Sequence, residues 1–266
     1  MKLVITAPRG KMGNLITLIA ADRPDIEIVG GLGPKGRDYI GKDIGEVAAI
    51  GKMVGAPVYD SIEDIIDACD CVVDFSTVEE AMHILDVCRA KGKALVCGST
   101  GFSEEQKQAF VDAGEDIPVM LAANTSRMVN VMRILLEQAA KALGETCDIE
   151  IVDMHDQKKL DSPSGTAKEL GEAMAAAMGV ELSEHDKYGR GPGRDVREDG
   201  QIAFHSLRGG DTPSSHIVYF MGNGERLEIA HHSINWKCFA SGAVDAAEWI
   251  VKQPKGSYVI SDCTEL

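Results

Sequence analysis

Short apolar runs alternate with helical patterns over the first 120 residues. Brief continuous apolar runs predict strands, and segments whose apolar residues recur every three or four positions predict helices. The expected strands are residues 3–6, 26–29, 72–75, 94–97 and 119–121, and the expected helices are residues 13–21, 62–68, 78–91 and 103–113. Strands that alternate with helices in this way are typical of an α/β fold with a doubly wound parallel sheet.

The pattern changes from residue 149 onward. Alternating or apolar stretches follow one another closely at residues 202–207, 216–220 and 226–231, which indicates a second, α+β domain with a mixed or antiparallel sheet. A helix over residues 129–142 is expected to connect the domains, and a helix over 238–252 to return to the first. The predicted division is a domain of residues 1–126, completed by residues 237–266, and a domain of residues 127–236. The glycine-rich, charged segment 183–200 is interpreted as a mobile loop or lid.

Composition and charge argue against several classes of partner. The chain has 266 residues and a formal net charge of −15, which argues against affinity for nucleic acid or anionic membranes. No apolar run approaches the ~20 residues that span a bilayer, and the first apolar stretch is too short for a secretory signal. The seven cysteines are odd in number and scattered, which favours reduced thiols in a cytoplasmic protein and no metal site. An anionic ligand must therefore meet locally gathered positive charge.

The strongest candidate site is the segment IEIVDMHDQKKLDSPSGTA, residues 149–167. A buried strand ends near His155, charged residues including Lys159 follow, and Ser164 begins a helix whose free N–H groups suit a carboxylate or phosphate. Gly165 lets a ligand approach the backbone, and Thr166 adds a hydroxyl donor. The alternative interpretation is a polar loop before a capped helix, with solvated charges. The concentration of these features in nineteen residues favours an active site.

A glycine loop follows the first strand. Residues 7–13 read APRGKMG and precede an apolar helix, the context in which a dinucleotide diphosphate lies on a helix N-terminus in Rossmann-like folds. The G-x-G-x-x-G pattern is incomplete, because only Gly10 and Gly13 are present and Pro8 lacks an N–H. Taken alone, this loop fits a cofactor site or a tight turn without a ligand.

The end of the second strand bears on the choice of cofactor. An acidic residue there would bind the ribose 2′-hydroxyl of NADH, but this chain has GPKGR at residues 33–37. Lys35 and Arg37 fit a 2′-phosphate, which favours NADPH; the alternative is that both are solvated loop cations. Residues 98–102 and 122–126 each follow a predicted strand, so they are expected at the carboxyl edge of the sheet, where cofactor and substrate meet.

A series of motifs gives the chain a resemblance over essentially its full length. They are KLVITAPRGKMG, VVDFSTVEEA, CGSTGF, AANTSRMVNVM, MHDQKKLDSPSGTA, SLRGGD, GERLEIAHH and FASGAV. In this order they resemble the dihydrodipicolinate reductase (4-hydroxy-tetrahydrodipicolinate reductase) family of lysine and diaminopimelate biosynthesis. The resemblance implies a dinucleotide-binding domain completed by the C-terminal helix, and a second domain whose sheet assembles a homotetramer. It also implies reduction of an unsaturated cyclic dicarboxylate by NADPH or NADH.

The resemblance assigns roles to individual residues. His155 falls on the family's general acid, and Lys159 falls on the lysine that binds and polarises the substrate. The other candidate substrate residues are Asp156, Ser164, Gly165, Thr166 and Trp236. The candidate cofactor residues are Ala7, Arg9, Gly10, Lys11, Met12, Gly13, Lys35, Phe75, Gly98, Thr100, Ala122, Asn124 and Thr125.

The chain departs from the family pattern within the candidate site. Asp156 stands where the family has the second of two adjacent histidines, and Trp236 stands at the expected position of an arginine. Both changes make the pocket less favourable to a substrate with two carboxylates. Ala7, Pro8 and Thr125 also differ from the usual glycine loop and from the residue near the nicotinamide.

Two alternative functions follow from these departures. One is a reductase of the same fold that acts on a different imine or unsaturated carboxylate, and the other is a non-catalytic nucleotide-sensing protein. His231 and His232 are not expected to form a metal pair, because adjacent strand residues point to opposite faces. Residues 208–211, reading RGGD, predict a hairpin turn, and the family resemblance places them near the functional face of the second domain.

Overall fold

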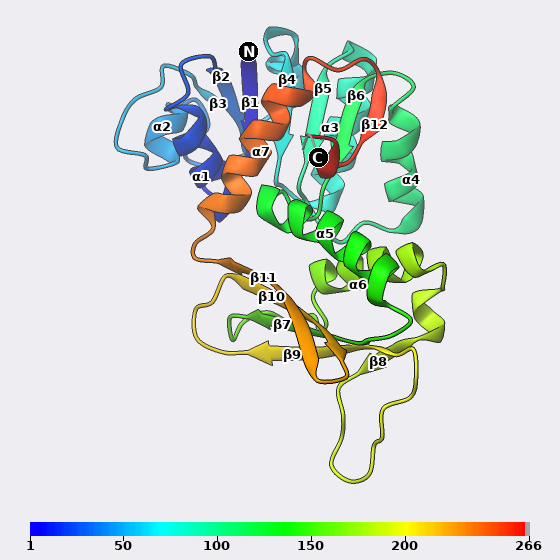
Figure 1. The fold of residues 1–266 in the computed structure, drawn as a ribbon. Helices are drawn as coiled ribbons and strands as arrows, with labels where there is room; N and C mark the ends of the chain where they lie inside the picture. The colour runs from blue at the N-terminus through cyan, green and yellow to red at the C-terminus, as the bar shows by residue number, and fades with distance from the viewer. Residues whose placement is uncertain (264–266) are drawn as a thin grey trace. The chain divides into compact units, whose positions relative to one another are not determined.

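The computed structural model describes residues 1–263, which form two compact units (Figure 1). The first unit comprises residues 1–127 and the described residues from 236 onward, and the second comprises residues 128–235. Residues 264–266, which the expected first domain includes, lie outside the described residues. Within residues 1–263, no helix has the length and apolar character needed to cross a membrane.

The first unit is built on a seven-stranded sheet in the order β12-β6-β5-β4-β1-β2-β3. Every neighbouring pair in this sheet is parallel, which confirms the predicted doubly wound α/β fold. The strands are β1 (Lys2–Thr6), β2 (Glu27–Leu32), β3 (Val58–Tyr59), β4 (Cys71–Asp74), β5 (Ala94–Cys97), β6 (Pro118–Leu121) and β12 (Gly256–Tyr258).

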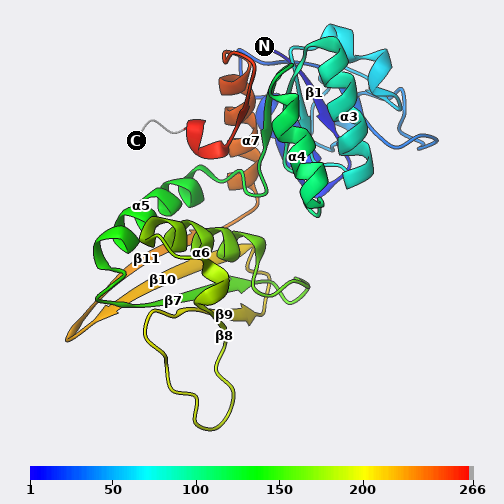
Figure 2. The ribbon, with the colours of Figure 1, turned by 90° about the vertical axis from the view of Figure 1, so that its right-hand side faces the viewer.

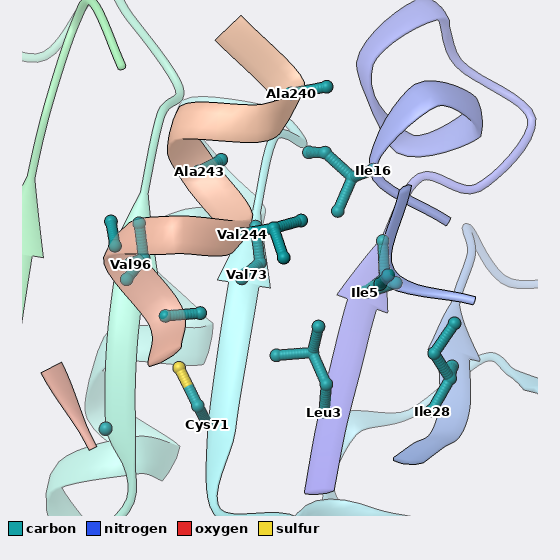
Figure 3. Packing of buried hydrophobic residues seen from close by; sticks show 14 of the residues in the cluster. Leu3, Ile5, Ile16, Ile28, Cys71, Val73, Val96, Ala240, Ala243 and Val244 are labelled. Atoms are coloured by element: carbon teal, nitrogen blue, oxygen red, sulfur yellow. The ribbon is translucent and has the colours of Figure 1, made fainter. Parts of the chain in front are cut away.

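Helices cover both faces of this sheet because its strands are apolar on both sides. Leu3 and Ile5 of β1 point into one core, and Val4 between them points into the other. The first core contains α1 (Lys11–Ala20) and α7 (Lys237–Ile250), as Figure 3 shows, so the predicted return of the last helix to this unit is confirmed. The second core contains α3 (Val78–Lys91) and α4 (Glu104–Ala113).

The expected helix over residues 62–68 was wrong. Two short 3₁₀ turns, η1 (Ile62–Asp64) and η2 (Ile66–Ala68), replace it, and Ile65 between them has a non-helical φ of −126°. Ile62, Ile65 and Ile66 are all buried in the second core. Seven residues are too few for a stable helix by propensity, and burying these isoleucines together determines the backbone instead. A further short helix, α2 (Ile44–Val47), precedes β3.

The second unit is a five-stranded mixed sheet in the order β11-β10-β7-β9-β8. Its central strand, β7 (Asp148–His155), is parallel to β9 (Ile202–Arg208) and antiparallel to β10 (Ser214–Gly222). The helices α5 (Arg127–Leu143) and α6 (Gly165–Met178) pack on one face of the sheet (Figure 2). The remaining elements are β8 (Asp186–Tyr188), β11 (Glu225–Ser233), η3 (Leu182–Glu184) and, in the first unit, η4 (Ile260–Cys263).

The expected hairpin turn at residues 208–211 was also wrong. The strands on either side of it, β9 and β10, do not pair with each other, because β7 lies between them. The loop therefore crosses the end of β7, and the Gly209 N–H donates to the His155 carbonyl over 3.0 Å. The local sequence predicted the change of chain direction correctly. The order of the strands, however, is set by the pairing of β9 and β10 with β7, which lies about fifty residues earlier in the chain.

The expected lid, residues 183–200, contains a strand. Residues 186–188 form β8, which pairs in parallel with β9 at the edge of the sheet, and the loop after it extends away from the sheet (Figures 1 and 2). Two arginines of this loop, Arg190 and Arg197, bind the buried carboxylate of Glu150 on β7. Although burial raises the pKa of Glu150, the hydrogen bonds from Arg190 and His205 lower it more. The loop is thus anchored to the sheet by two buried ion pairs.

Candidate active site

The core face of the second sheet changes from apolar to polar toward the end of β7. Side chains alternate between faces along a strand, so Ile149, Ile151, Asp153 and His155 share one face. The first two lie in the core beneath α6. Asp153 lies beside His216 of β10 and beside a serine of β9 in the sheet register. The row that continues the hydrophobic core is thus a row of hydrogen-bonding and titratable groups.

Asp153 is the buried anion of this cluster, with 1% of its surface exposed. Its carboxylate accepts a hydrogen bond from the Ser164 N–H over 2.6 Å and is bound by the Arg208 guanidinium. The His155 Nδ1 lies 3.5 Å from Asp153 Oδ1. Burial raises the pKa of Asp153, but the contacts with His155, Arg208 and the Ser164 N–H lower it by more, so its pKa lies well below the usual range.

His216 is a functional candidate that the sequence reasoning missed. It has no exposed surface, and its ring lies edge-on to that of His155 at a centroid distance of 5.4 Å. Its Nε2 lies 3.2 Å from Ser164 Oγ, and its Nδ1 lies 3.4 Å from Ser214 Oγ. Burial and the nearby His155 lower the pKa of His216 to about 3, so it is neutral at pH 7. The sequence placed it only within the expected strand 216–220, and no motif marked it.

The start of α6 has the arrangement that the sequence predicts. Ser164 is the N-cap, and its Oγ accepts the Ala167 N–H over 3.2 Å. Gly165 is the first helical residue, and a Cβ added to it would contact nothing within 4 Å. Packing therefore does not require glycine at this position, and the open space leaves room for a ligand above the backbone. Thr166 follows in the first turn of the same helix.

Lys159 is held by the loop that joins β7 to α6. Its Nζ lies 2.8 Å from Asp161 Oδ1, and only 27% of its side-chain surface is exposed. Burial raises the pKa of Asp161, but its contacts, led by the hydrogen bond from Lys159, lower it overall. Asp156 binds within its own loop, since its Oδ1 accepts the Lys158 N–H over 2.7 Å. The structure therefore places Lys159, His155 and the start of α6 on one polar end of the second unit.

Arg208 is the second residue of this cluster without an assigned role in the sequence reasoning. Besides Asp153, it binds the Asp161 carbonyl through Nη2 over 2.8 Å. It therefore joins the end of β9 to both β7 and the loop that carries Lys159. The RGGD motif was the available signal: it predicted a turn, and the family resemblance placed it near the functional face of the second domain, without a role for Arg208.

The first unit carries the expected glycine loop between β1 and α1. Ala7 has a φ of +47°, a conformation that favours glycine, and its carbonyl accepts the Gly10 N–H over 2.8 Å. A Cβ on Gly13 would lie 2.1 Å from the Ala7 oxygen, so only glycine fits there. Gly10 is the N-cap of α1, with no side chain capping the helix. The backbone thus forms a close turn onto a helix N-terminus, which suits a dinucleotide diphosphate although the glycine motif is incomplete.

A buried carboxylate fixes the carboxyl edge of the first sheet. Asp74 has no exposed surface and accepts hydrogen bonds from Thr6 Oγ1 and Ser99 Oγ, each over 2.9 Å, so it joins the ends of β1, β4 and the loop after β5. The ring of Phe75 lies against Gly98, where a Cβ would approach it to 2.2 Å. Phe75 and Gly98, both predicted cofactor residues, are therefore in contact. Asp74 itself was read only as part of a strand.

The adenosine side of the expected cofactor site contains a carboxylate that the sequence reasoning left out. Arg9 Nη1 lies 3.1 Å from Asp38 Oδ1, and the Arg9 guanidinium lies 5.5 Å from the centre of the Tyr39 ring. Both members of this ion pair are mostly exposed. Lys35 and Arg37 are exposed in the preceding turn. Positive charge thus gathers beyond the end of β2, with one acidic residue beside it.

Trp236 lies in the first unit, against the glycine loop. Lys11 Nζ is 4.1 Å from the centre of the Trp236 ring, which places a predicted substrate residue beside a predicted cofactor residue. Thr125 is buried and its hydroxyl donates to the Phe239 carbonyl over 2.6 Å, which ties the end of β6 to α7. Of the other predicted cofactor residues, Ala122 is buried, Met12 and Asn124 are partly buried, and Thr100 is exposed at the carboxyl edge.

Residues 1–263 contain no group of three or more histidine, cysteine or acidic side chains arranged to hold a metal ion. The two sets of candidate residues are each assembled within one unit. The groups suited to a dinucleotide lie in the first, and the buried acid, cation and helix start lie in the second.

Comparison with known proteins identifies the family. The model of the dihydrodipicolinate reductase N-terminus matches residues 1–125, and the model of its C-terminus matches residues 128–263. The 4-hydroxy-tetrahydrodipicolinate reductase of Halorhodospira halophila is 40% identical over 253 residues, which cover 95% of this chain and 94% of the relative. The reductase of the same name from Pseudomonas fluorescens is 38% identical over 266 residues, covering 100% and 99% of the two chains.

Solved structures support the same fold. A dipicolinate-bound dihydrodipicolinate reductase from Paenisporosarcina sp. TG-14 matches with a TM-score of 0.79 and 24% identity, covering 98% of each chain. An amine dehydrogenase from Mycobacterium smegmatis matches with a TM-score of 0.64 and 14% identity, covering 98% of this chain and 95% of the other. These two matches concern the fold, whereas the family models and the relatives carry the assignment. The chain belongs to the dihydrodipicolinate reductase family, whose members are NAD(P)H-dependent oxidoreductases.

Proposed function

We propose that this protein reduces 4-hydroxy-tetrahydrodipicolinate to tetrahydrodipicolinate in lysine and diaminopimelate biosynthesis. The observation that carries the proposal is the polar cluster at the end of β7, where His155 and Lys159 lie beside the open start of α6. The named relatives, 37–40% identical over nearly the whole chain, support this substrate. When bound, NADPH or NADH supplies the hydride.

Lys159 and the start of α6 are proposed to hold a substrate carboxylate. Lys159 pairs with the exposed carboxylate of Asp161. A substrate carboxylate can therefore replace Asp161 at the ammonium without leaving a buried charge unpaired. The open space above Gly165 lies at the positive end of α6, where an anion is favoured. Ser164 and Thr166 belong to the same turn. The same ammonium is suited to polarise the ring system of the substrate.

His155 is proposed to supply the proton that accompanies reduction. Hydride addition to the unsaturated ring places an electron pair on the ring, and a positioned acid must protonate it. His155 is 8% exposed and lies at the end of a central strand, so its ring is held rigidly by its neighbours. The neighbouring Asp156 side chain accepts a hydrogen bond from the Lys158 N–H of its own loop.

We also propose a preference for NADPH. Arg9, Lys35 and Arg37 offer positive charge beyond β2, whereas Asp38, the acidic residue there, is paired with Arg9. A 2′-phosphate can replace Asp38 at the guanidinium, because this ion pair is exposed and weak. Measurement of the dissociation constants of NADPH and NADH by calorimetry tests the preference; equal constants, or tighter NADH binding, contradict it.

A homotetramer is proposed from the second sheet. Helices α5 and α6 cover one face, and the opposite face carries apolar side chains, among them Leu207, which is 47% exposed, and Met221, which is 39% exposed. Half-buried Val152, Ile217 and Tyr219 share that face. An apolar sheet face that no helix covers is usually buried against another copy of the chain. Light scattering coupled to size-exclusion chromatography tests the assembly.

A cytoplasmic location is proposed from the seven free cysteines.

The deciding experiment supplies the substrate in situ from its synthase and follows NADPH and NADH oxidation. Fast turnover that Lys159→Ala abolishes supports the proposal. Cofactor binding with turnover only on another imine or unsaturated carboxylate identifies a reductase of changed substrate. Cofactor binding without turnover on any of these compounds, together with an unchanged cellular function in His155→Gln, identifies a nucleotide sensor.

A further inference from the structure

Asp153 makes contact with three separate parts of the candidate active site. Its Oδ1 faces His155 at 3.5 Å on the same strand, and its Oδ2 accepts the Ser164 N–H at the start of α6. Arg208 of β9 binds the same carboxylate and also the Asp161 carbonyl, beside Lys159. One carboxylate therefore stands between the proposed acid and the proposed anion site.

The position of this carboxylate is costly for the fold. Asp153 follows Ile149 and Ile151 at the core-facing positions of β7, where an apolar side chain would continue the core. A buried carboxylate is tolerated only when it is paired and hydrogen-bonded. Arg208, the Ser164 N–H and His155 meet that requirement and hold the pKa of Asp153 well below its usual range despite burial. Asp153 is therefore an anion at pH 7.

The two ring nitrogens of His155 have different surroundings. Nδ1 is buried, and among residues 1–263 it has no hydrogen-bond partner of standard geometry; Asp153 Oδ1 at 3.5 Å is the acceptor it faces. A carboxylate at that side favours a proton on Nδ1, both in the imidazolium and in the neutral ring. The proton available for transfer is then the one on Nε2.

We propose that Asp153 is the positioning residue of this reductase: it holds the His155 imidazole with Nδ1 inward, so that Nε2 donates the proton, and it fixes Ser164 at the start of the anion-binding helix. The inference rests on the proposed role of His155 as the acid. It assigns Asp153 no contact with substrate or cofactor.

The charges around His155 make Asp153 the group that matters. Arg208 on β9 and Lys159 in the loop after β7 are cations, bound to Asp153 and to Asp161 respectively. His216 on β10, beside Asp153 in the register, is neutral. His231 on β11 lies next to His216, and burial lowers its pKa as well. Among the charged groups named here, Asp153 is the buried anion that faces His155.

The first test compares Asp153→Asn, Asp153→Glu and the control Asp148→Asn. Asp148 begins the same strand, and its side chain is about half exposed in an ion pair with Arg197. Asp153→Asn keeps the shape and removes the charge, so kcat is expected to fall about 100-fold, and the pH limb that reports the acid is expected to move to lower pH. Asp153→Glu restores the charge and is expected to return kcat to within about tenfold of the wild type, with the original pH limb. Asp148→Asn is expected to match the wild type.

The second test needs no variant of Asp153 and therefore stands even where Asp153→Asn does not fold. Histidine labelled with ¹⁵N in the full-length protein reports the tautomer of neutral His155 by long-range ¹H–¹⁵N correlation, and His155→Gln assigns its signals. The expected tautomer carries hydrogen on Nδ1; hydrogen on Nε2 overturns the proposal. So does an Asp153→Asn protein with wild-type kcat and pH profile. If His155→Gln itself keeps full activity, the proposed role of His155 has failed, which is a separate result.

Discussion

The first candidate site is made mainly of backbone groups, and the second is made of side chains. In the first unit the loop between β1 and α1 works through its backbone: the Ala7 carbonyl, the Gly10 cap and the close approach at Gly13 create the turn. In the second unit the site is made of buried side chains, with Asp153 and His216 nearly or fully inaccessible. A backbone site tolerates a change of side chain wherever the dihedral angles survive, as the left-handed Ala7 illustrates. A site made of buried side chains does not tolerate such a change, because each side chain satisfies the charge or the hydrogen-bonding groups of another.

The largest expected effect lies in the second site. Lys159→Ala removes the ammonium proposed to bind and polarise the substrate, and kcat/KM is expected to fall about 1,000-fold. The dissociation constant of NADPH is expected to stay unchanged. Lys158→Ala, one residue away and exposed, is the matched control and is expected to keep wild-type kinetics. Steady-state kinetics together with calorimetry separate the two quantities, and a Lys159→Ala enzyme with full activity would remove the main support for the proposed function.

Two substitutions with opposite expected effects on stability test the backbone site. Gly13→Ala places a Cβ against the Ala7 carbonyl at 2.1 Å, so the loop must move, and unfolding free energy is expected to fall by about 3 kcal/mol with loss of cofactor binding. Ala7→Gly relieves a residue at φ +47° and is expected to raise stability by about 1 kcal/mol while cofactor binding is kept. Urea denaturation and NADPH titration measure both. Tighter folding of Gly13→Ala would show that the turn is not fixed by this contact.

Acid should weaken the second unit through His216. Its folded pKa of about 3 lies below the ~6.5 of an unfolded histidine, so the unfolded chain binds more protons between these values. Stability is therefore fully present above pH 6.5 and is lost as pH falls toward 3, by about 1 kcal/mol per pH unit. His216→Gln is expected to flatten this slope between pH 6.5 and 4.5, whereas the exposed His232→Gln is expected to keep it. His231, whose pKa is lowered by burial and by the neighbouring His232, is present in both variants. Identical slopes in wild type and His216→Gln would contradict the assignment.

The smallest expected effect concerns Trp236. An exposed cation–π contact contributes about 0.5–1 kcal/mol, so Trp236→Ala is expected to weaken NADPH binding about threefold to fivefold by releasing Lys11. Trp236→Phe keeps an aromatic face and is expected to bind nearly as the wild type does. Trp249→Phe, in the interior of α7, controls for general loss of packing. The measurement is NADPH titration by calorimetry. An increase in substrate KM with unchanged cofactor affinity would instead assign Trp236 to the substrate, as the family pattern suggests.

Sequence reasoning succeeded for features that local interactions determine, and it failed for features that depend on contacts between residues far apart in the chain. Strands β1, β2, β4, β5 and β6 and helices α1, α3, α4 and α7 were predicted because each is marked by its own apolar pattern, whereas the short β3, β12 and α2 were not predicted. The start of α6 was predicted because its capping residues are local in sequence. The segment 62–68 failed because three isoleucines follow the demands of the core rather than a helical period. The RGGD turn failed because the identity of the neighbouring strand is not a local property.

The sequence alone determined the α/β architecture, the family and the segment from His155 to Thr166, since periodicity, caps and motifs are written within a few turns of chain. Only the tertiary structure decided that Asp153, Arg208 and His216 surround His155, because they come from three strands whose lateral order sets Asp153 beside His216 and His155 beside Arg208 in two neighbouring rows. It also decided which charges are paired. Burial and distance set the ionisation of Asp153 and His216, and both are properties of the packed chain that no single stretch of sequence contains.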